Sequence, residues 1–465
     1  MDTVMSSAGN AASVARDELL RQAIARARRS EFYGTRLAGC DLQARADLER
    51  LPLTFKDHLR DASPFGMLTV PAARAWHYHE TSGTKGEPIS TWCGLSELRR
   101  MAEVVCRMVP ELSAETILLN RFPLFAPVSF VFEEALRQAD ACHIAAGNMT
   151  WDVPFSRVLD LIRRLRVTAL SSLPLEPILL RELALMQGAD LRRDLGSLRV
   201  IFCGGAVLPA AMRRVIEKDW DARVVEIYGS NETMLLGVGC TEGRLHLCAE
   251  LLEFEVLDPQ THQPVPPGER GLLTVTSLVH EVMPLVRYVT GDLIRLDPEP
   301  CPCGQGGPVA QVFGRFEDLI EIDGARASAG EILDAAYDFA DRLATRVFFI
   351  LVLRRGLHLL IEVDGPHRTR DAEAERHLAE RVGLPVTVEY LGYNEVMDRS
   401  ALFRGPKIYK PSQISDWRGA GRKTITIMEA LLEWPRFDLG TLMQIGRRQL
   451  RNARRRRRLM REEGQ

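Results

Sequence analysis

A short loop rich in glycine and hydroxyl side chains is the first feature of this sequence that could do chemistry. It comprises Thr81, Ser82, Gly83, Thr84, Lys85 and Gly86. Glycines let the backbone turn its N–H groups toward one point, and the hydroxyls and the lysine add donors, so the loop can wrap a polyphosphate. Its spacing is not that of the GxxxxGK[ST] phosphate loop. Such a run taken alone is usually a plain turn. Whether this loop binds phosphate therefore depends on the other motifs of the chain.

Five further segments combine glycines with reactive or charged side chains. The first two close predicted strands, where open α/β sheets bind ligands. They are Cys203, Gly204, Gly205 and Ala206, followed by Tyr228, Gly229, Ser230, Asn231 and Glu232. The other three are residues 287–292 with Asp292 on a tight turn, residues 314–324 with Arg315 and Asp318, and residues 404–410 with Lys407 and Lys410.

The hydrophobic pattern describes the elements that must position these segments. Residues 14–60 look helical, and strands then alternate with helices up to about residue 230, which predicts a mostly parallel α/β sheet. Helices are predicted over 130–138, 155–165, 176–186, 209–219, 329–339 and 370–381, and strands over 198–202, 223–227, 251–257, 271–277, 293–296, 319–322, 346–352 and 358–363. After residue 239, β segments between Gly/Pro turns predict an antiparallel sheet or small barrel attached to the core.

The predicted fold class is α/β with more than one domain, because 465 residues exceed one ordinary core. A large N-terminal domain of α/β sheets spans residues 1–318 and includes a small β subdomain at about 240–315. The order β-α-β-β-α then predicts a small C-terminal α+β domain over 319–420. A helical, basic extension covers 421–465.

Composition excludes several classes of protein. Hydrophobic residues make up 46% of the chain and charged residues 26%, as in soluble globular proteins. The net charge of −2 gives no overall attraction to nucleic acid or membrane. No apolar run is long enough to span a bilayer, and the N-terminus lacks an apolar signal core. Nine scattered cysteines, an odd number, do not form a disulfide framework. We therefore expect a cytoplasmic protein.

The order of the motifs resembles that of the adenylate-forming superfamily of acyl- and aryl-CoA synthetases. The sequence reads TSGTxGxP, YGxxE, RYxTGD and GRxxDxIxIxG, followed by a late lysine. The segments FYGTRL, LPLTFKDHLRDASPFG, PLVRYVTGDL and CPCG narrow the resemblance to the phenylacetate-CoA ligase branch. Several independent motifs in the right order make the resemblance specific, and it runs from about residue 30 to about 416.

The resemblance implies a role for each motif. Residues 81–86 would hold the β- and γ-phosphates of ATP, and Glu232 would bind Mg²⁺. Asp292 would accept hydrogen bonds from the ribose hydroxyls, and Arg315 would pair with ribose or phosphate oxygens. The adenine would lie between Gly204, Gly205, Ala206 and the segment Tyr228, Gly229, Ser230 and Asn231. Lys407 would neutralise charge as a carboxylate attacks the α-phosphate. The small domain would be mobile and rotate about a hinge at Asp318 between two half-reactions.

Three departures from the family pattern stand out. Lys85 replaces a small residue of the phosphate loop, and Ala206 occupies a position where relatives commonly carry an acid. Residues 405–407 fit the usual glycine-lysine step poorly, so Lys410 competes with Lys407 for the catalytic role.

Four residues could form a structural zinc site. Cys301 and Cys303 form a short pair, and Cys240 and His246 lie upstream on a glycine-containing loop, which together give a closed Cys₃His set. Cys248 could replace one ligand, and reduced thiols in a loop are the alternative. Some relatives in the phenylacetate-CoA ligase branch look similar here.

The acyl pocket is expected near residues 120–130, Cys203 and residues 228–233. Phe122, Phe125 and Phe130 could enclose an aromatic acid or could each belong to the core. An aryl or arylacetic acid is what the family implies.

The C-terminal end of the chain is rich in arginine, and such a run is typically a solvated tail. Its arginines are Arg447, Arg448, Arg451, Arg454 to Arg458 and Arg461. It could instead bind an acidic partner such as an acyl carrier protein, and we do not expect a nucleic-acid partner.

The sequence therefore predicts an enzyme that converts a small carboxylic acid and ATP to an acyl-adenylate. The acyl group would then pass to a thiol, foremost that of coenzyme A. A carrier-protein thiol or an amine is the alternative acceptor, and a non-catalytic nucleotide-binding descendant is a second alternative. Whether the protein is a homodimer stays open.

Overall fold

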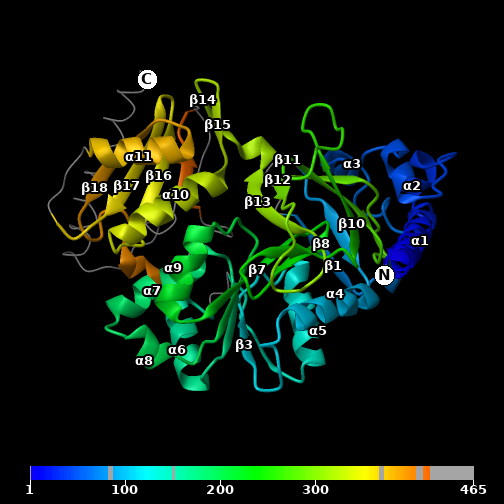
Figure 1. Cartoon of the computed structure of the whole chain (residues 1–465). Helices are drawn as coiled ribbons and strands as arrows, with labels where there is room; N and C mark the ends of the chain where they lie inside the picture. Colours follow the sequence, from blue (N-terminus) through cyan, green and yellow to red (C-terminus); the bar gives the residue numbers. More distant parts are fainter. Residues whose placement is uncertain (1, 82–86, 149–151, 366–370, 405–411, 419–465) are drawn as a thin grey trace.

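The computed structural model describes residues 2–81, 87–148, 152–365, 371–404 and 412–418, with the side chains of 2–13, 401 and 404 set aside. One sheet of eleven strands runs through the large domain in the order β10-β11-β12-β13-β9-β8-β7-β6-β5-β3-β4 (Figure 1). Its parallel half consists of β3 (Ile117–Asn120), β4 (Cys142–Ala145), β5 (Ala169–Ser172), β6 (Val200–Gly204) and β7 (Arg223–Ser230). The α/β fold class is thereby confirmed.

The predicted β subdomain is the antiparallel continuation of this same sheet and not a separate barrel. Its strands are β8 (Met234–Gly239), β9 (Leu245–Leu247), β10 (Leu252–Leu257), β11 (Arg270–Ser277), β12 (Tyr288–Leu296) and β13 (Val309–Arg315). The direction changes at the β7–β8 hairpin, where Gly229 pairs with Leu235 and Ser230 pairs with Met234. The motif at residues 228–232 therefore lies where the two halves of the sheet join.

Helices cover both faces of the sheet. One hydrophobic cluster includes side chains of α6 (Phe155–Leu165), α7 (Leu175–Met186), α8 (Leu191–Leu195) and α9 (Ala210–Trp220). The second cluster includes side chains of α1 (Asp2–Ala27), α4 (Leu95–Met108) and α5 (Pro127–Gln138). Their apolar residues recur at helical spacing, which predicts one buried face for each helix.

The N-terminal segment is a series of short helices and one hairpin. After α1 come α2 (Glu31–Arg36), the 3₁₀ turn η1 (Arg45–Arg50), α3 (Lys56–Asp61) and the 3₁₀ turn η2 (Ala72–Arg74). Strands β1 (His77–Glu80) and β2 (Ser90–Cys93) then pair on either side of the glycine-rich loop. Hairpin pairing makes the loop a connection between two hydrogen-bonded strands. The sequence pattern had not predicted these strands.

The C-terminal domain is small and mixed. It follows η3 (Phe316–Asp318) and contains β14 (Ile320–Ile322), β15 (Ala325–Ala327), α10 (Ala329–Arg342), β16 (Phe348–Leu353), β17 (Gly356–Glu362), α11 (Ala372–Val382), β18 (Val386–Leu391), η4 (Arg399–Arg404) and β19 (Ile414–Asp416). Ser328 and Glu331 form a capping box at the start of α10, which explains why the helix begins there. The sheet order β18-β17-β16-β19 adds two strands to the predicted pattern.

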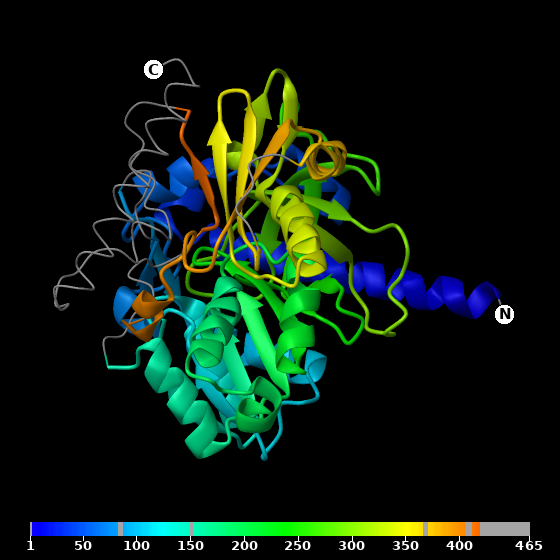
Figure 2. The same cartoon turned by 90° about the vertical axis from the view of Figure 1, so that its left-hand side faces the viewer.

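The small domain packs against α7 and α9 of the large domain (Figures 1 and 2). The hydrophobic cluster that fills the α6–α9 face continues into α10, β16 and β17. Buried ion pairs lie at the same contact. Arg346 Nε is 2.7 Å from Asp219 of α9, and Arg399 Nε is 2.7 Å from Glu182 of α7. The two domains therefore share both apolar packing and charged contacts.

No helix of the described part of the chain combines the length and apolar character needed to cross a bilayer.

Candidate functional site

Three side chains of the predicted motifs meet between β7, β12 and β13. Asp292 pairs with Arg315 in the β12–β13 register, and their side chains form an ion pair with an Nε–Oδ1 distance of 3.1 Å. Tyr228 donates its hydroxyl to Asp292 Oδ2 at 2.7 Å. Burial raises the pKa of Asp292, against the opposing effect of Arg315. The sheet thus fixes one carboxylate whose two oxygens face a hydroxyl donor and a guanidinium.

A second carboxylate lies next to this group. Glu232 is 3% exposed, and its Oε1 is 3.5 Å from the Tyr288 hydroxyl, which donates to it. The same oxygen is 3.6 Å from Nζ of Lys56, at the start of α3. One buried carboxylate with a nearby cation is suited to hold Mg²⁺ together with the phosphates of a nucleotide, because Mg²⁺ is commonly bound by one or two carboxylates plus substrate phosphates.

Glycines bring the backbone unusually close at the ends of β6 and β7. A Cβ atom on Gly204 would lie 2.6 Å from the Ile227 carbonyl oxygen, and one on Gly229 would lie 1.8 Å from that of Met234. Gly205 has a φ of +81°, which disfavours any other residue. Gly205 and Ala206 are exposed beyond the end of β6, so they offer backbone to a ligand at the strand end where α/β sheets bind one.

The β1–β2 hairpin connects the phosphate loop to these strands. Asn231 donates its side-chain amide to the Glu80 carbonyl at 2.6 Å. Thr81 is held to Ile89 by two hydrogen bonds, one from its own N–H at 3.1 Å and one to its hydroxyl at 2.9 Å. The rest of the predicted loop, Ser82 to Gly86, lies outside the described residues, as do the competing lysines Lys407 and Lys410.

The aromatic residues predicted for the acyl pocket differ in environment. Phe122 is 1% exposed and packs edge-on against Phe132, 5.3 Å between ring centres, inside the core. Phe125 is 52% exposed, and Phe130 is half-buried with its ring 3.8 Å from that of His77. Cys203, at the end of β6, is fully buried, which raises the pKa of its thiol.

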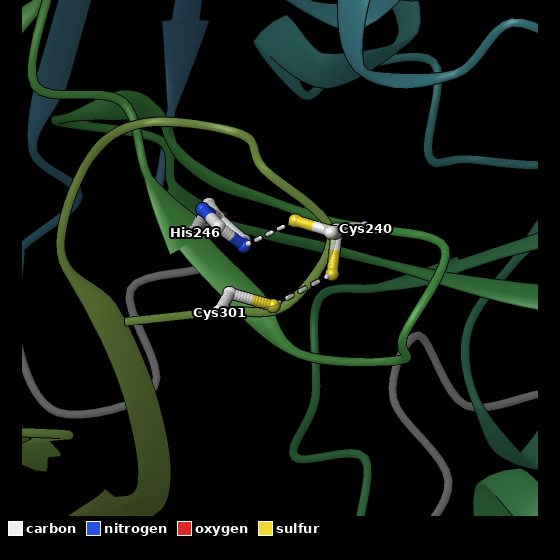
Figure 3. A group of neighbouring side chains, drawn as sticks. Cys240, His246 and Cys301 are labelled. Carbon is white, nitrogen blue, oxygen red and sulfur yellow. Dashed lines mark hydrogen bonds between the residues drawn. The ribbon is translucent and has the colours of Figure 1, made fainter. Parts of the chain in front are cut away.

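The four predicted metal ligands converge. Ligand atoms of Cys240, His246, Cys301 and Cys303 all lie within 4.8 Å of one another, a group that does not include Cys248. Figure 3 shows Cys240, His246 and Cys301 directed toward a common centre. The Cys240 and Cys301 sulfurs are 3.7 Å apart, close to the separation of about 3.8 Å that tetrahedral Zn–S bonds of about 2.3 Å require. His246 Nδ1 lies 3.1 Å from the Gly306 carbonyl, and Nε2 faces the other ligands, 3.3 Å from the Cys303 sulfur, as a metal ligand would.

Comparison with known proteins agrees with this geometry. The family model described as AMP-binding enzyme matches residues 81–283. The phenylacetate-coenzyme A ligase of Thermus thermophilus is 32% identical over 290 residues, which cover 60% of this chain and 63% of that one. The ligase of the same name from Pseudomonas putida is 29% identical over 317 residues, covering 65% of this chain and 70% of that one.

Over these stretches the chain is similar to the phenylacetate-coenzyme A ligases. The resemblance to the adenylate-forming superfamily is confirmed. The matched region spans just under two thirds of the Thermus thermophilus and Aromatoleum evansii ligases.

Solved structures confirm the fold. A 2-hydroxyisobutyryl-CoA ligase in its postadenylation state superposes with a TM-score of 0.74 at 20% identity, covering 87% of this chain and 90% of that one. The same ligase in its thioesterification state gives a TM-score of 0.61, at 21% identity and with 88% and 90% coverage.

Two site residues and one hydrogen bond escaped the sequence argument. Lys56 lies in one of the segments that narrow the resemblance to the phenylacetate-CoA ligase branch, yet nothing in the spacing links it to Glu232. Tyr288 follows Arg287 in the RYxTGD motif, but its burial against Glu232 depends on the fold. The hydrogen bond from Tyr228 to Asp292 is likewise invisible in sequence. Conservation of Lys56 and Tyr288 among relatives would be the sequence signal for their role, since single lysines and tyrosines carry no motif of their own.

Proposed function

We propose that this chain activates a carboxylic acid with ATP, forming an acyl-adenylate and pyrophosphate, and then transfers the acyl group to coenzyme A. One observation carries the proposal. Four side chains converge where the parallel and antiparallel halves of the sheet join, beside the β1–β2 hairpin that flanks the phosphate loop: Asp292, Tyr228, Arg315 and Glu232. Relatives named phenylacetate-coenzyme A ligase support an arylacetic acid as the substrate and coenzyme A as the acceptor.

The described side chains suit distinct parts of a bound nucleotide. Asp292 would accept hydrogen bonds from the ribose hydroxyls while Tyr228 and Arg315 hold its carboxylate in place. Glu232 would hold Mg²⁺, which offsets phosphate charge as pyrophosphate leaves. Lys56, 3.6 Å from Glu232, would add positive charge near the phosphates. Lys407 or Lys410 would neutralise the α-phosphate, and the small domain would rotate about Asp318 between the half-reactions.

The proposal is tested by carboxylate-dependent exchange of pyrophosphate into ATP, with Mg²⁺ and without coenzyme A. We expect exchange with at least one class in a panel of arylacetic, aryl and aliphatic acids. Adding coenzyme A or a carrier protein to the productive acid then identifies the acceptor. ATP binding without exchange for any acid would contradict the proposal and favour a non-catalytic nucleotide-binding protein.

We also propose that Cys240, His246, Cys301 and Cys303 hold a structural zinc ion. Cys₃His is a closed ligand set, and the site ties the β8–β9 turn to the β12–β13 loop, so metal binding contributes to folding. The chemistry of the donor set fits zinc, with no open position for a substrate.

The purified protein is expected to contain about one zinc ion per chain, and Cys301→Ser or Cys303→Ser should lower both zinc content and the melting temperature. Metal analysis and thermal unfolding provide the two measurements. Cys142→Ser, at an exposed cysteine, serves as the control and should change neither. A metal-free protein with an unchanged melting temperature on adding zinc would overturn the assignment.

A further inference from the structure

Two buried polar side chains lie side by side in the β1–β2 hairpin and have no hydrogen-bond partner among the described residues. His79 is 1% exposed and Thr91 is fully buried, and they are directly paired across the two strands, so their side chains share one face. Within the part of the chain that the structure describes, neither nitrogen of His79 has a partner, nor does the hydroxyl of Thr91. Buried polar groups are nearly always hydrogen-bonded, so two adjacent exceptions need an explanation.

Two of the three aromatic residues predicted for the acyl pocket lie near His79. The ring of Phe130 is 5.4 Å from that of His79, and the ring of Phe125 is 6.1 Å away. Phe125 is half-exposed, so one of the two rings next to His79 reaches the surface. His79 therefore borders aromatic side chains that connect it to the surface of the domain.

The pair also lies close to the reacting end of the proposed site. The residue after His79 is Glu80, whose carbonyl accepts the amide of Asn231 at 2.6 Å. The residue after that is Thr81, the first of the phosphate loop. An acid whose carboxylate faces that loop and whose body lies against Phe125 and Phe130 would bring its far end toward His79.

We propose that His79 and Thr91 form a polar floor of the acyl pocket and select an acid that carries a neutral hydroxyl group away from its carboxylate. This inference rests on the proposed function. Burial lowers the pKa of His79 to about 4, so its ring is neutral near pH 7 and presents one donor and one acceptor. A hydroxyl both donates and accepts, which matches the pair.

A charged substituent is a poor match for the same place. The rings in contact with His79 are two phenyl rings and the ring of His77, and its cross-strand partner is Thr91. None of these offers a counter-charge, and an unpaired charge in such surroundings would be strongly disfavoured. A buried water bridging the two side chains is the competing explanation, since internal waters commonly satisfy such groups.

Matched pairs of acids that differ by one hydroxyl separate these explanations. The pairs are phenylacetic and 4-hydroxyphenylacetic acid, 3-phenylpropanoic and 3-(4-hydroxyphenyl)propanoic acid, and hexanoic and 6-hydroxyhexanoic acid, each assayed by ATP–pyrophosphate exchange. We expect the hydroxylated member of at least one pair to have a kcat/KM about 30-fold higher or more, because a site built to hydrogen-bond a hydroxyl rejects the analogue that lacks it.

Two variants assign that preference to the pair. His79→Phe and the nearly isosteric Thr91→Val should each reduce the ratio to within about threefold, because the hydroxylated acid loses more kcat/KM than the unsubstituted acid does. His79→Gln retains a donor and an acceptor and should keep part of the preference, and thermal unfolding confirms that each variant is folded.

Four outcomes would overturn the inference. Exchange without preference in any pair leaves the proposed function standing and removes the polar floor. A preference for the hydroxylated acid that survives both substitutions would show that His79 and Thr91 do not select it. Variants that lower kcat/KM equally for both acids of a pair would favour the alternative, in which a buried water bridges His79 and Thr91. Exchange with no acid at all overturns the proposed function and this inference together.

Discussion

Replacing Asp292 with alanine should lower kcat/KM for ATP by about a hundredfold or more, because hydrogen bonds to a charged group contribute about 1.5–3 kcal/mol each and a ribose presents two hydroxyls. The substitution should also disturb the two side chains that contact the carboxylate. Tyr228 and Arg315 both bind Asp292 and would be left without that partner. Pyrophosphate exchange at varied ATP concentration, with equilibrium ATP binding, measures the effect.

Two further substitutions make this result specific. Tyr228→Phe keeps the carboxylate and removes one donor to it, so we expect a smaller loss of about tenfold. Glu269→Gln changes an exposed acid in the turn before β11 and should leave kcat/KM within about twofold, as expected for a surface substitution away from the site. An Asp292→Ala protein that is folded and binds ATP with unchanged affinity would contradict the assignment of Asp292 to the ribose.

Arg399→Met is expected to destabilise the protein by about 3–5 kcal/mol, since removing one partner of a buried ion pair leaves uncompensated charge. Arg399 lies between Glu182 of α7 and Glu362 of β17, at 2.7 and 2.6 Å. All three side chains are at most 6% exposed. Because Glu182 belongs to the large domain and Arg399 to the small one, the loss should weaken the docking of the two domains.

Urea denaturation followed by tryptophan fluorescence measures this effect, and small-angle scattering reports whether the domains separate. The matched control is Arg326→Met. Arg326 pairs with Glu321 at 2.7 Å, but both side chains are about half exposed, and an exposed pair contributes about 0–1 kcal/mol. Equal stability of the two variants would show that the buried contact between the domains contributes nothing beyond a surface pair.

The local hydrophobic pattern was sufficient to predict many of the helices. The predicted helix at 155–165 coincides with α6, and those at 176–186, 209–219 and 329–339 lie within a few residues of α7, α9 and α10. Amphipathic periodicity and caps are properties of neighbouring residues, so the sequence carries them directly. The region 14–60 was predicted only as helical, whereas it divides into α1, α2, η1 and α3. Helices of six residues, such as α2 and α3, are too short for a repeated amphipathic pattern that would mark where they begin and end.

The sequence by itself determined the chemistry that the chain can offer. The order of the motifs identified the superfamily, and the residue types of Cys240, His246, Cys301 and Cys303 named a metal-ligand set that the fold brings together. These signals survive in sequence because each depends on residue identity and order.

Only the tertiary structure decided which of these residues meet. Lys56 reaches Glu232, Tyr228 reaches Asp292, and the antiparallel strands join the parallel sheet at the β7–β8 hairpin. His79 and Thr91 lie opposite each other because the hairpin register pairs them, and neither side chain has a hydrogen-bond partner among the described residues. Periodicity shows that a face is buried but not what it is buried against. Strand order and register fix those long-range partners, and both are set by packing of the whole chain.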